Sequence, residues 1–308
     1  MELQTEQNLF LEHLKQQNKS FNTVKNYRTD LNIFNQFLTE KGRSLDLSGI
    51  ETEELKEYQR YLENKYSSSN SIRRRVQALR LFFDYLITQE KFDHNPIKKI
   101  VSSPKNVKLP APVLFPEIRM VESYLIKRYE QAQDFEKLLS LRNLILIHLI
   151  YDGNLKVSQI EKVKMTHLLT KDDNLRVLIV PEKREPFTIP LSKKCLDYIK
   201  EYKPLLNAQK DKDQIDFDDL FFNGNPYKIL RGGLSARGIE IFFKDLSNKL
   251  QMDISARSLR QSCIFKWHNQ NVPESTIKER MGVQPQYSLG PFQKMIKDDP
   301  AKYIFDEL

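Results

Sequence analysis

The sequence predicts a mainly α-helical protein with a small β-sheet, divided into two domains, and three observations predict it. Apolar residues recur every three or four positions along most of the 308-residue chain, which is the spacing of one helix face. One stretch, residues 175–191, instead alternates β-branched and polar residues around a polar turn, as a pair of strands does. A segment with three prolines, SSPKNVKLPAPVLF, lies between the helical regions and excludes both helix and sheet.

The N-terminal domain, residues 1–100, is predicted to be an all-helical bundle. Gly42 ends its second helix, because glycine tolerates the left-handed backbone that closes a helix. Thr52 is the expected N-cap of the third helix, and serines together with Asn70 are expected to cap the fourth. The four helical segments are 5–17, 21–42, 52–66 and 67–91.

Residues 101–113 are predicted to be an extended linker, and residues 114–308 a second domain of α and β structure. Its C-terminal tail, residues 293–308, leaves two alternatives open. The tail either donates apolar side chains to a neighbouring molecule or folds back on its own domain. The expected elements of this domain are helices 115–129 and 134–152, the strand pair 175–191, and helices 192–206, 235–250, 255–271 and 273–282.

Composition and charge narrow the class of protein. The formal net charge of +8 favours a polyanionic partner, although solubility alone would also account for it. Cys195 and Cys263 fall inside apolar helical patterns and are interpreted as small core residues in a reducing compartment. The N-terminus has no apolar signal-peptide region, and no apolar run has the length of a membrane span. The protein is therefore predicted to be cytoplasmic.

Positive charge gathers at two places in the N-terminal domain where packing is not expected to need it. Arg73, Arg74 and Arg75 stand near the predicted start of the fourth helix, where a cation is unfavourable unless an anion binds. Lys25 and Arg28 lie three residues apart on the second helix and are candidates for the same nucleic-acid groove. The alternative in both cases is a solvated helix surface.

The second domain has two further basic sites. Lys183 and Arg184 occupy the predicted tip of the strand pair, which either carries a cation into a groove or is an ordinary soluble loop. Arg257 and Arg260 follow Ser255, the expected N-cap of helix 255–271, on one side of its first turn. Two guanidinium groups placed in this way repel each other unless an anion lies between them, so the pattern predicts an anion site.

With these motifs, the chain resembles the tyrosine recombinases, the phage integrase and Xer-like family. The resemblance covers almost the whole chain. Residues 5–99 resemble the family's helical, SAM-like core-binding domain, and residues 114–308 resemble its α+β catalytic domain. The family's active site has an Arg in a GLR-[IVT]-[SG]-E segment, a Lys on a β-hairpin, an H-x-x-R at a helix start, a His or Trp after LG, and a Tyr nine residues later.

The chain departs from this family pattern at most of its chemical positions. YDGNLKVSQI matches the first segment, but lysine replaces the arginine and Gln159 replaces the glutamate. Only the hairpin lysine and the arginine of H-x-x-R are kept, and the nucleophile position holds phenylalanine. In the order of the chain, the residues at the six matched positions are Lys156, Lys183, Arg257, Arg260, Val283 and Phe292.

These substitutions imply that covalent chemistry is lost while affinity for DNA is kept. Phe292 has no hydroxyl oxygen with which to attack a phosphodiester. Lys156 offers one point charge where arginine would offer a fork for two phosphate oxygens. Arg257 stays protonated and cannot act as a general acid or base. The expected phosphate-binding cup consists of Lys156, Lys183, Arg257 and Arg260.

Other interpretations stay open. An active recombinase would need a displaced tyrosine, either Tyr287 or Tyr303. Phe292 would alternatively be an engineered replacement of a tyrosine, although the other substitutions argue for a degenerate native site. A protein-interaction scaffold with a decayed DNA groove is a further alternative.

The resemblance implies double-stranded DNA as the partner and association with the nucleoid rather than a membrane. No cofactor is expected, and no metal is expected because the histidines are scattered without the spacing of metal ligands. It implies a homo-oligomer on DNA, formed by exchange of the C-terminal tail, or a hetero-oligomer with an active recombinase. The role would be in site-specific recombination or integration, in its regulation, or in DNA architecture. The apolar residues that the tail would donate are Tyr303, Ile304, Phe305 and Leu308.

Overall fold

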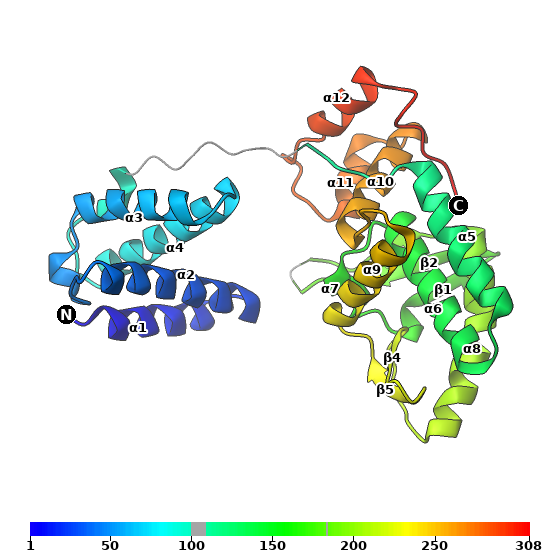
Figure 1. The fold of residues 1–308 in the computed structure, drawn as a ribbon. Helices are drawn as coiled ribbons and strands as arrows, with labels where there is room; N and C mark the ends of the chain where they lie inside the picture. Colours follow the sequence, from blue (N-terminus) through cyan, green and yellow to red (C-terminus); the bar gives the residue numbers. More distant parts are fainter. Residues whose placement is uncertain (100–108, 183) are drawn as a thin grey trace. The chain divides into compact units, whose positions relative to one another are not determined.

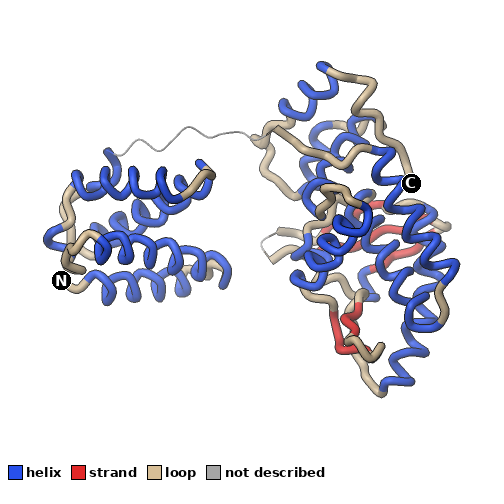
Figure 2. The backbone as a smooth tube through the Cα atoms, viewed as in Figure 1, coloured by secondary structure: helices blue, strands red, loops and turns tan. Residues whose placement is uncertain are grey.

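The computed structural model describes residues 1–99, 109–182 and 184–308. It divides into two compact units, Met1–Lys108 and Leu109–Leu308, and each unit has its own hydrophobic core. Figures 1 and 2 trace these units, in which helices predominate and strands are few, so the predicted fold class is confirmed. Lys183 and residues 101–108 of the predicted linker lie outside the described residues.

Four helices with apolar inner faces form the first unit. Phe34 and Phe37 pack on the buried Tyr58, with ring centroids 4.9 and 5.3 Å away, so aromatic side chains fill the centre. The elements are α1 (Leu3–Gln16), α2 (Phe21–Glu40), α3 (Thr52–Lys65) and α4 (Ser69–Thr88), with the 3-10 turns η1 (Leu47–Gly49) and η2 (Pro96–Lys99).

The helix boundaries confirm some expected caps and correct others. Gly42 has the left-handed φ of 64° that was expected after α2. The prediction that Thr52 caps α3 is wrong, because Thr52 is already helical and Glu51 is the N-cap. Asn70 likewise lies inside α4, which a serine, Ser68, precedes. Consequently Arg73 is in the second turn of α4, beyond the first four N–H groups that lack a helical partner.

The second unit surrounds α6, which is buried on almost all sides and packs against α5, α8 and α10. Residues 141–151 of α6 are buried with the exception of Asn143. Such a helix holds the turn that follows it in a fixed position. The helices are α5 (Phe115–Gln131), α6 (Asp134–Tyr151), α7 (Val157–Ile160), α8 (Lys193–Asp213), α9 (Ala236–Leu250), α10 (Ala256–Asn269), α11 (Glu274–Met281) and α12 (Gly290–Asp298), with the 3-10 turn η3 (Met165–His167).

Two small antiparallel sheets complete this unit. The strands β1 (Leu168–Lys171), β2 (Asn174–Ile179) and β3 (Phe187–Pro190) form one sheet in that order, and Val177 of β2 pairs with Leu168 and Ile189. The strands β4 (Phe222–Gly224) and β5 (Leu230–Gly233) form the other. The predicted strand pair is confirmed as β2 and β3. The sequence pattern misses β1, β4 and β5, because three or four residues carry too little alternation to be recognised.

The C-terminal tail packs on its own unit. Tyr303 and Phe305 stack on Phe265 of α10, with ring centroids 4.9 and 5.4 Å away. The Tyr151 hydroxyl donates a hydrogen bond of 2.6 Å to the Asp306 carbonyl oxygen. Of the two alternatives for the tail, this single chain adopts the one that folds back. None of the helices in the described ranges has the length and apolar character needed to cross a lipid bilayer.

Candidate nucleic-acid interface

The turn after α6 is shaped by two residues with special backbone requirements. Gly153 leaves no room for a side chain, because a Cβ atom there would lie 2.8 Å from the Leu149 carbonyl oxygen. Asn154 follows with a left-handed φ of 55°, which asparagine tolerates better than most residues. The chain then enters α7 with Lys156 as its N-cap, whose N–H donates to the Gln159 side chain at 2.8 Å. The tight turn thus fixes the position of the Lys156 backbone at the start of α7.

The same turn holds the arginine of α10. Arg260 donates from Nε to the Asn154 carbonyl oxygen and from Nη2 to Asn154 Oδ1, each at 2.9 Å. Asn154 Nδ2 in return donates to the Arg260 carbonyl oxygen at 2.7 Å. Ser255 is the N-cap of α10, as predicted, and accepts from the N–H of Ser258 at 3.1 Å. The half-buried Arg260 is therefore fixed in place, with its Nη1 group unbonded among the described residues.

Four cationic side chains lie near one another around this turn. Lys156 and Arg184 line a common cavity of about 480 Å³ between the turn and the sheet. Burial lowers the pKa of Lys156, and the charges of Arg260 and Arg184 lower it further. Burial also lowers the pKa of Arg260, and Arg257 on the exposed side of the same helix turn adds to that effect. Like charges this close disfavour one another unless an anion is present.

We define the cationic cup as Lys156, Arg184, Arg257 and Arg260. Within the described ranges, no carboxylate lies within ion-pairing distance of any of these four side chains. Arg184 instead donates to the carbonyl oxygen of Gly282, which joins the loop after β2 to the end of α11. The cup contains three of the predicted cup residues, and the fourth, Lys183, lies outside the described residues. Its geometry suits phosphate oxygens, which would supply the missing negative charge.

Position 292 lies in the core rather than at a surface. Phe292 is 5% exposed, and its ring packs 5.3 Å from that of Phe265. Tyr303 is 9% exposed and stacks on the same Phe265 ring. Tyr287 differs from both, because it is 41% exposed and its phenol lies close enough to Arg260 to interact with its charge. Val283 is half-buried and offers no hydrogen-bonding group.

A buried network of charged side chains lies next to the turn that carries the cup. The sequence gives no periodic signal for this network. Lys266 Nζ lies 2.6 Å from Asp152 Oδ1, and both side chains are buried. His148 Nδ1 lies 2.9 Å from the other oxygen of Asp152. Burial alone would raise the pKa of Asp152, but the Lys266 charge and the His148 contact outweigh it and hold that pKa well below its usual range. Asp152 directly precedes Gly153, so this network anchors the turn.

The three neighbouring arginines of α4 differ in burial and in their contacts, although the sequence predicts the same role for all three. The expectation that packing does not need these side chains is wrong for Arg75, which is 8% exposed and stacks 3.8 Å from the centre of the Tyr66 ring. Arg74 is exposed but donates to the fully buried Asp30 carboxylate at 2.8 Å. Arg73 is half-buried and bonds the Asn70 side chain. Arg75 therefore serves the bundle, and only its neighbours present charge to solvent.

Lys25 and Arg28 lie on α2 and are both exposed. Among the described residues, neither has a carboxylate within ion-pairing distance. Their placement agrees with the predicted groove-facing position and equally with a solvated helix surface. The fold alone therefore leaves both alternatives for this pair.

Sequence comparison with known proteins agrees with the two-domain fold described above. Residues 8–90 match the family described as "Phage integrase, N-terminal SAM-like domain". The tyrosine recombinase XerC of Staphylococcus aureus (strain USA300 / TCH1516) is 29% identical over 282 residues, which cover 90% of this chain and 87% of that protein. The XerC of Staphylococcus saprophyticus is 25% identical over 269 residues, or 85% of this chain and 83% of the relative. Over most of its length, the chain is thus similar to tyrosine recombinases.

Solved tyrosine recombinase structures share the architecture. XerH bound to palindromic difH substrate has a TM-score of 0.71 at 16% identity, covering 92% of this chain and 81% of XerH. A lambda integrase (75–356) dimer bound to a COC' core site has a TM-score of 0.65 at 13% identity, covering 92% of this chain and 96% of the integrase chain. These likenesses concern the fold. The resemblance to tyrosine recombinases that the sequence motifs indicate is confirmed by the curated relatives, and these structures agree with it in fold.

Proposed function

We propose that this protein is a tyrosine recombinase family member that binds double-stranded DNA without forming a covalent link to it. It would act in or regulate site-specific recombination or integration, or serve as an architectural DNA-binding factor. The observation that carries the proposal is the pairing of a phenylalanine at the nucleophile position with a cationic cup that has kept its charge. Phe292 is buried against Phe265, while the cup has no carboxylate partner among the described residues.

Affinity for DNA is supported by charge and by the relatives. The chain carries a formal net charge of +8, and the cup concentrates four cations around one turn. XerH and lambda integrase are bound to DNA in the structures that resemble this chain. Binding would therefore depend strongly on salt, because each phosphate contact releases condensed counterions. Residues 1–100 and 114–308 would be the two DNA-clamping domains.

Loss of cleavage is supported by three independent changes. Phe292 lacks an attacking oxygen, Val283 cannot donate a hydrogen bond, and Arg257 cannot exchange a proton near neutral pH. A displaced nucleophile is the second candidate, and the structure favours Tyr287 over Tyr303 for it. Tyr287 is exposed beside Arg260, whereas Tyr303 would have to leave an aromatic stack.

Assembly follows from the same proposal. The C-terminal tail would leave its own unit on DNA and dock on a neighbour, giving a homo-oligomer or a hetero-oligomer with an active recombinase. Ile304 is 62% exposed beside the buried Phe305, so part of the tail's apolar surface stays uncovered on its own unit. We infer a cytoplasmic, nucleoid-associated protein on these grounds.

A binding experiment tests the DNA-binding part of the proposal. The full chain is incubated with a library of duplexes, the bound sites are mapped by footprinting, and affinity is measured by fluorescence anisotropy over a range of salt concentrations. Neutralising two cup residues together, Lys156→Gln with Arg257→Gln, should weaken binding at least ~10-fold and reduce the salt slope by about 1.8. The control is Arg237→Gln, which removes one positive charge at an exposed position paired with Glu240 and should change the affinity little. Unchanged affinity of the double variant would contradict DNA binding through the cup and favour a protein-interaction scaffold.

A further inference from the structure

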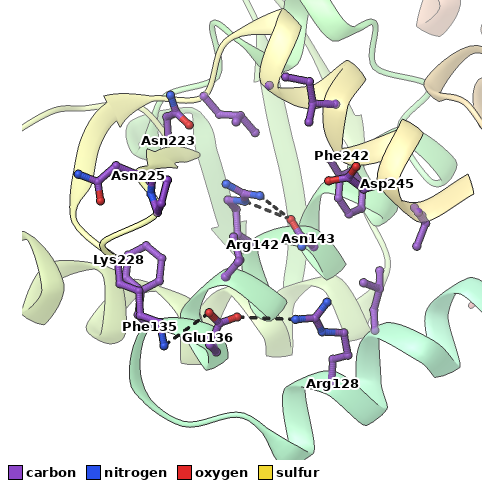
Figure 3. Close-up of a pocket in the computed structure, with 18 of the residues that line it drawn as sticks. Arg128, Phe135, Glu136, Arg142, Asn143, Asn223, Asn225, Lys228, Phe242 and Asp245 are labelled. Carbon is purple, nitrogen blue, oxygen red and sulfur yellow. Dashed lines mark hydrogen bonds and ion pairs between the residues drawn. The ribbon is translucent and has the colours of Figure 1, made fainter. Parts of the chain in front are cut away.

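A second cavity, of about 400 Å³, lies on another part of the second unit. Its walls come from α5, the first half of α6, the β4–β5 connection and α9 (Figure 3). It shares no lining residue with the cavity that Lys156 and Arg184 line. It is therefore separate from the candidate nucleic-acid interface.

The cavity contains a buried arginine whose hydrogen-bond partners are all neutral. Arg142 is 8% exposed, and its Nη1 donates to the Phe222 carbonyl oxygen at 3.0 Å. Its Nε and Nη2 both donate to Asn143 Oδ1, at 3.1 and 2.8 Å. The guanidinium also lies 5.0 Å from the centre of the Phe222 ring. Among the described residues, no carboxylate lies within 4.0 Å of it, and burial lowers the pKa of Arg142 to about 10.

A buried charge without an opposite charge is unusual, because proteins almost always pair such groups. Three of the five guanidinium N–H groups are used by the bonds above, so two remain to receive a ligand. In Figure 3 the Arg142 side chain stands in the middle of the drawn lining residues. The missing partner is therefore expected to come from outside the chain.

The rest of the lining adds to the positive charge. Arg128, Lys228 and Lys249 join Arg142, whereas the carboxylates in the lining are Glu136 and Asp245. Glu136 is already shared between Arg128 and Lys228, with N–O distances of 3.7 Å to each. Asp245 is exposed at the rim. The cavity thus keeps a surplus of positive charge, with Arg142 as its most buried member.

The remaining lining is largely apolar, with Phe135, Leu139, Phe242 and Leu246 among its residues. A volume of this size accommodates a small organic molecule, and buried apolar walls with a few charged groups are typical of such sites. We propose that the cavity binds a small organic anion, in which an apolar or aromatic body carries one carboxylate or phosphate group that pairs with Arg142. A duplex backbone is a poor fit, because Arg142 is too buried to reach a phosphate on a wide surface.

Ligand-observed NMR on the full chain tests this proposal with benzoate and phenyl phosphate as probes, and benzyl alcohol as the neutral control. Ligands of this size bind in the millimolar range, so probe concentrations on the order of 10 mM are needed. We expect saturable binding of at least one anionic probe, and no saturable binding of benzyl alcohol. The probe that binds with the higher affinity indicates whether the natural ligand carries a carboxylate or a phosphate group.

Substitutions assign the binding to the cavity. Arg142→Met should weaken binding of the anionic probe at least ~10-fold, because a charge-assisted hydrogen bond is lost in a buried site. The matched control is Arg237→Met, since Arg237 is an exposed arginine on α9 outside the cavity, and it should have no effect. Should Arg142→Met fail to fold, Asp245→Asn supplies a variant at an exposed position. It should strengthen anion binding roughly two- to fivefold by removing a repelling charge.

Two results would overturn the proposal. One is the absence of saturable binding by either anion. The other is equal binding by wild type, Arg142→Met and Asp245→Asn, which would leave Arg142 a purely structural residue that holds the Phe222 strand. Neither result bears on DNA binding by the cup, so the two proposals fail independently.

Discussion

Replacing Lys266 by methionine would leave the Asp152 carboxylate buried without its closest cation. The two side chains are only 5% and 4% exposed, and Lys266 Nζ lies 2.6 Å from Asp152 Oδ1. Removing one member of a buried pair costs about 3–5 kcal/mol, because the remaining charge is neither hydrated nor paired. We expect a loss of about 3 kcal/mol for Lys266→Met, at the lower end of that range, since His148 still contacts the other carboxylate oxygen.

Urea unfolding of the full chain measures this loss through one tryptophan. Trp267 is the chain's single tryptophan and is 2% exposed in α10, so its fluorescence reports on the second unit alone. The control is Arg237→Met, whose pair with Glu240 is 77% and 60% exposed and whose loss should cost less than about 1 kcal/mol. A Lys266→Met variant that loses less than about 1 kcal/mol would refute the argument that the turn depends on this pair.

Three further outcomes follow from buried groups. Burial alone would lower the pKa of His148, but contacts with two buried carboxylates outweigh it and raise that pKa. Its stabilisation should therefore be complete below pH 6.5 and lost as the pH rises through the raised value, and His148→Gln should remove this dependence in urea titrations followed by tryptophan fluorescence. Arg75→Gln should lower the stability of the first unit by about 1–3 kcal/mol in circular-dichroism melts, whereas Arg28→Gln at an exposed site should change it by less than ~0.5 kcal/mol. Cys263 is fully enclosed, and burial raises its pKa to about 12, so iodoacetamide should label it only after denaturant is added, as mass spectrometry would show.

Most helices could be predicted from the sequence because their apolar faces are long. The expected segment 134–152 corresponds to α6 within one residue, and Ser255 caps α10 as expected. Short elements could not be predicted in the same way. The strands β4 and β5 have three and four residues, and their pairing depends on long-range contacts that no local pattern contains.

The site was predictable where it depends on residue type and unpredictable where it depends on burial. Lys156, Arg257 and Arg260 could be identified from motif spacing, and the structure brings them together. Arg75 looks identical to its neighbours in the sequence, yet one helical step of 100° turns it into the core. Asn154, the partner of Arg260, gives no signal of its own, because a hydrogen bond between residues 106 positions apart requires the fold.

The most direct test of the central idea is a denaturing gel after incubation with nicked duplexes that carry the footprinted site. We expect no protein–DNA band that survives denaturant, either for the wild-type chain or for Phe292→Tyr, because a hydroxyl restored at a buried ring still lacks the other catalytic groups. Under native conditions both proteins should bind the same duplexes. A denaturant-resistant band from the wild-type chain, removed by Tyr287→Phe, would contradict this expectation and identify an active recombinase with a displaced nucleophile.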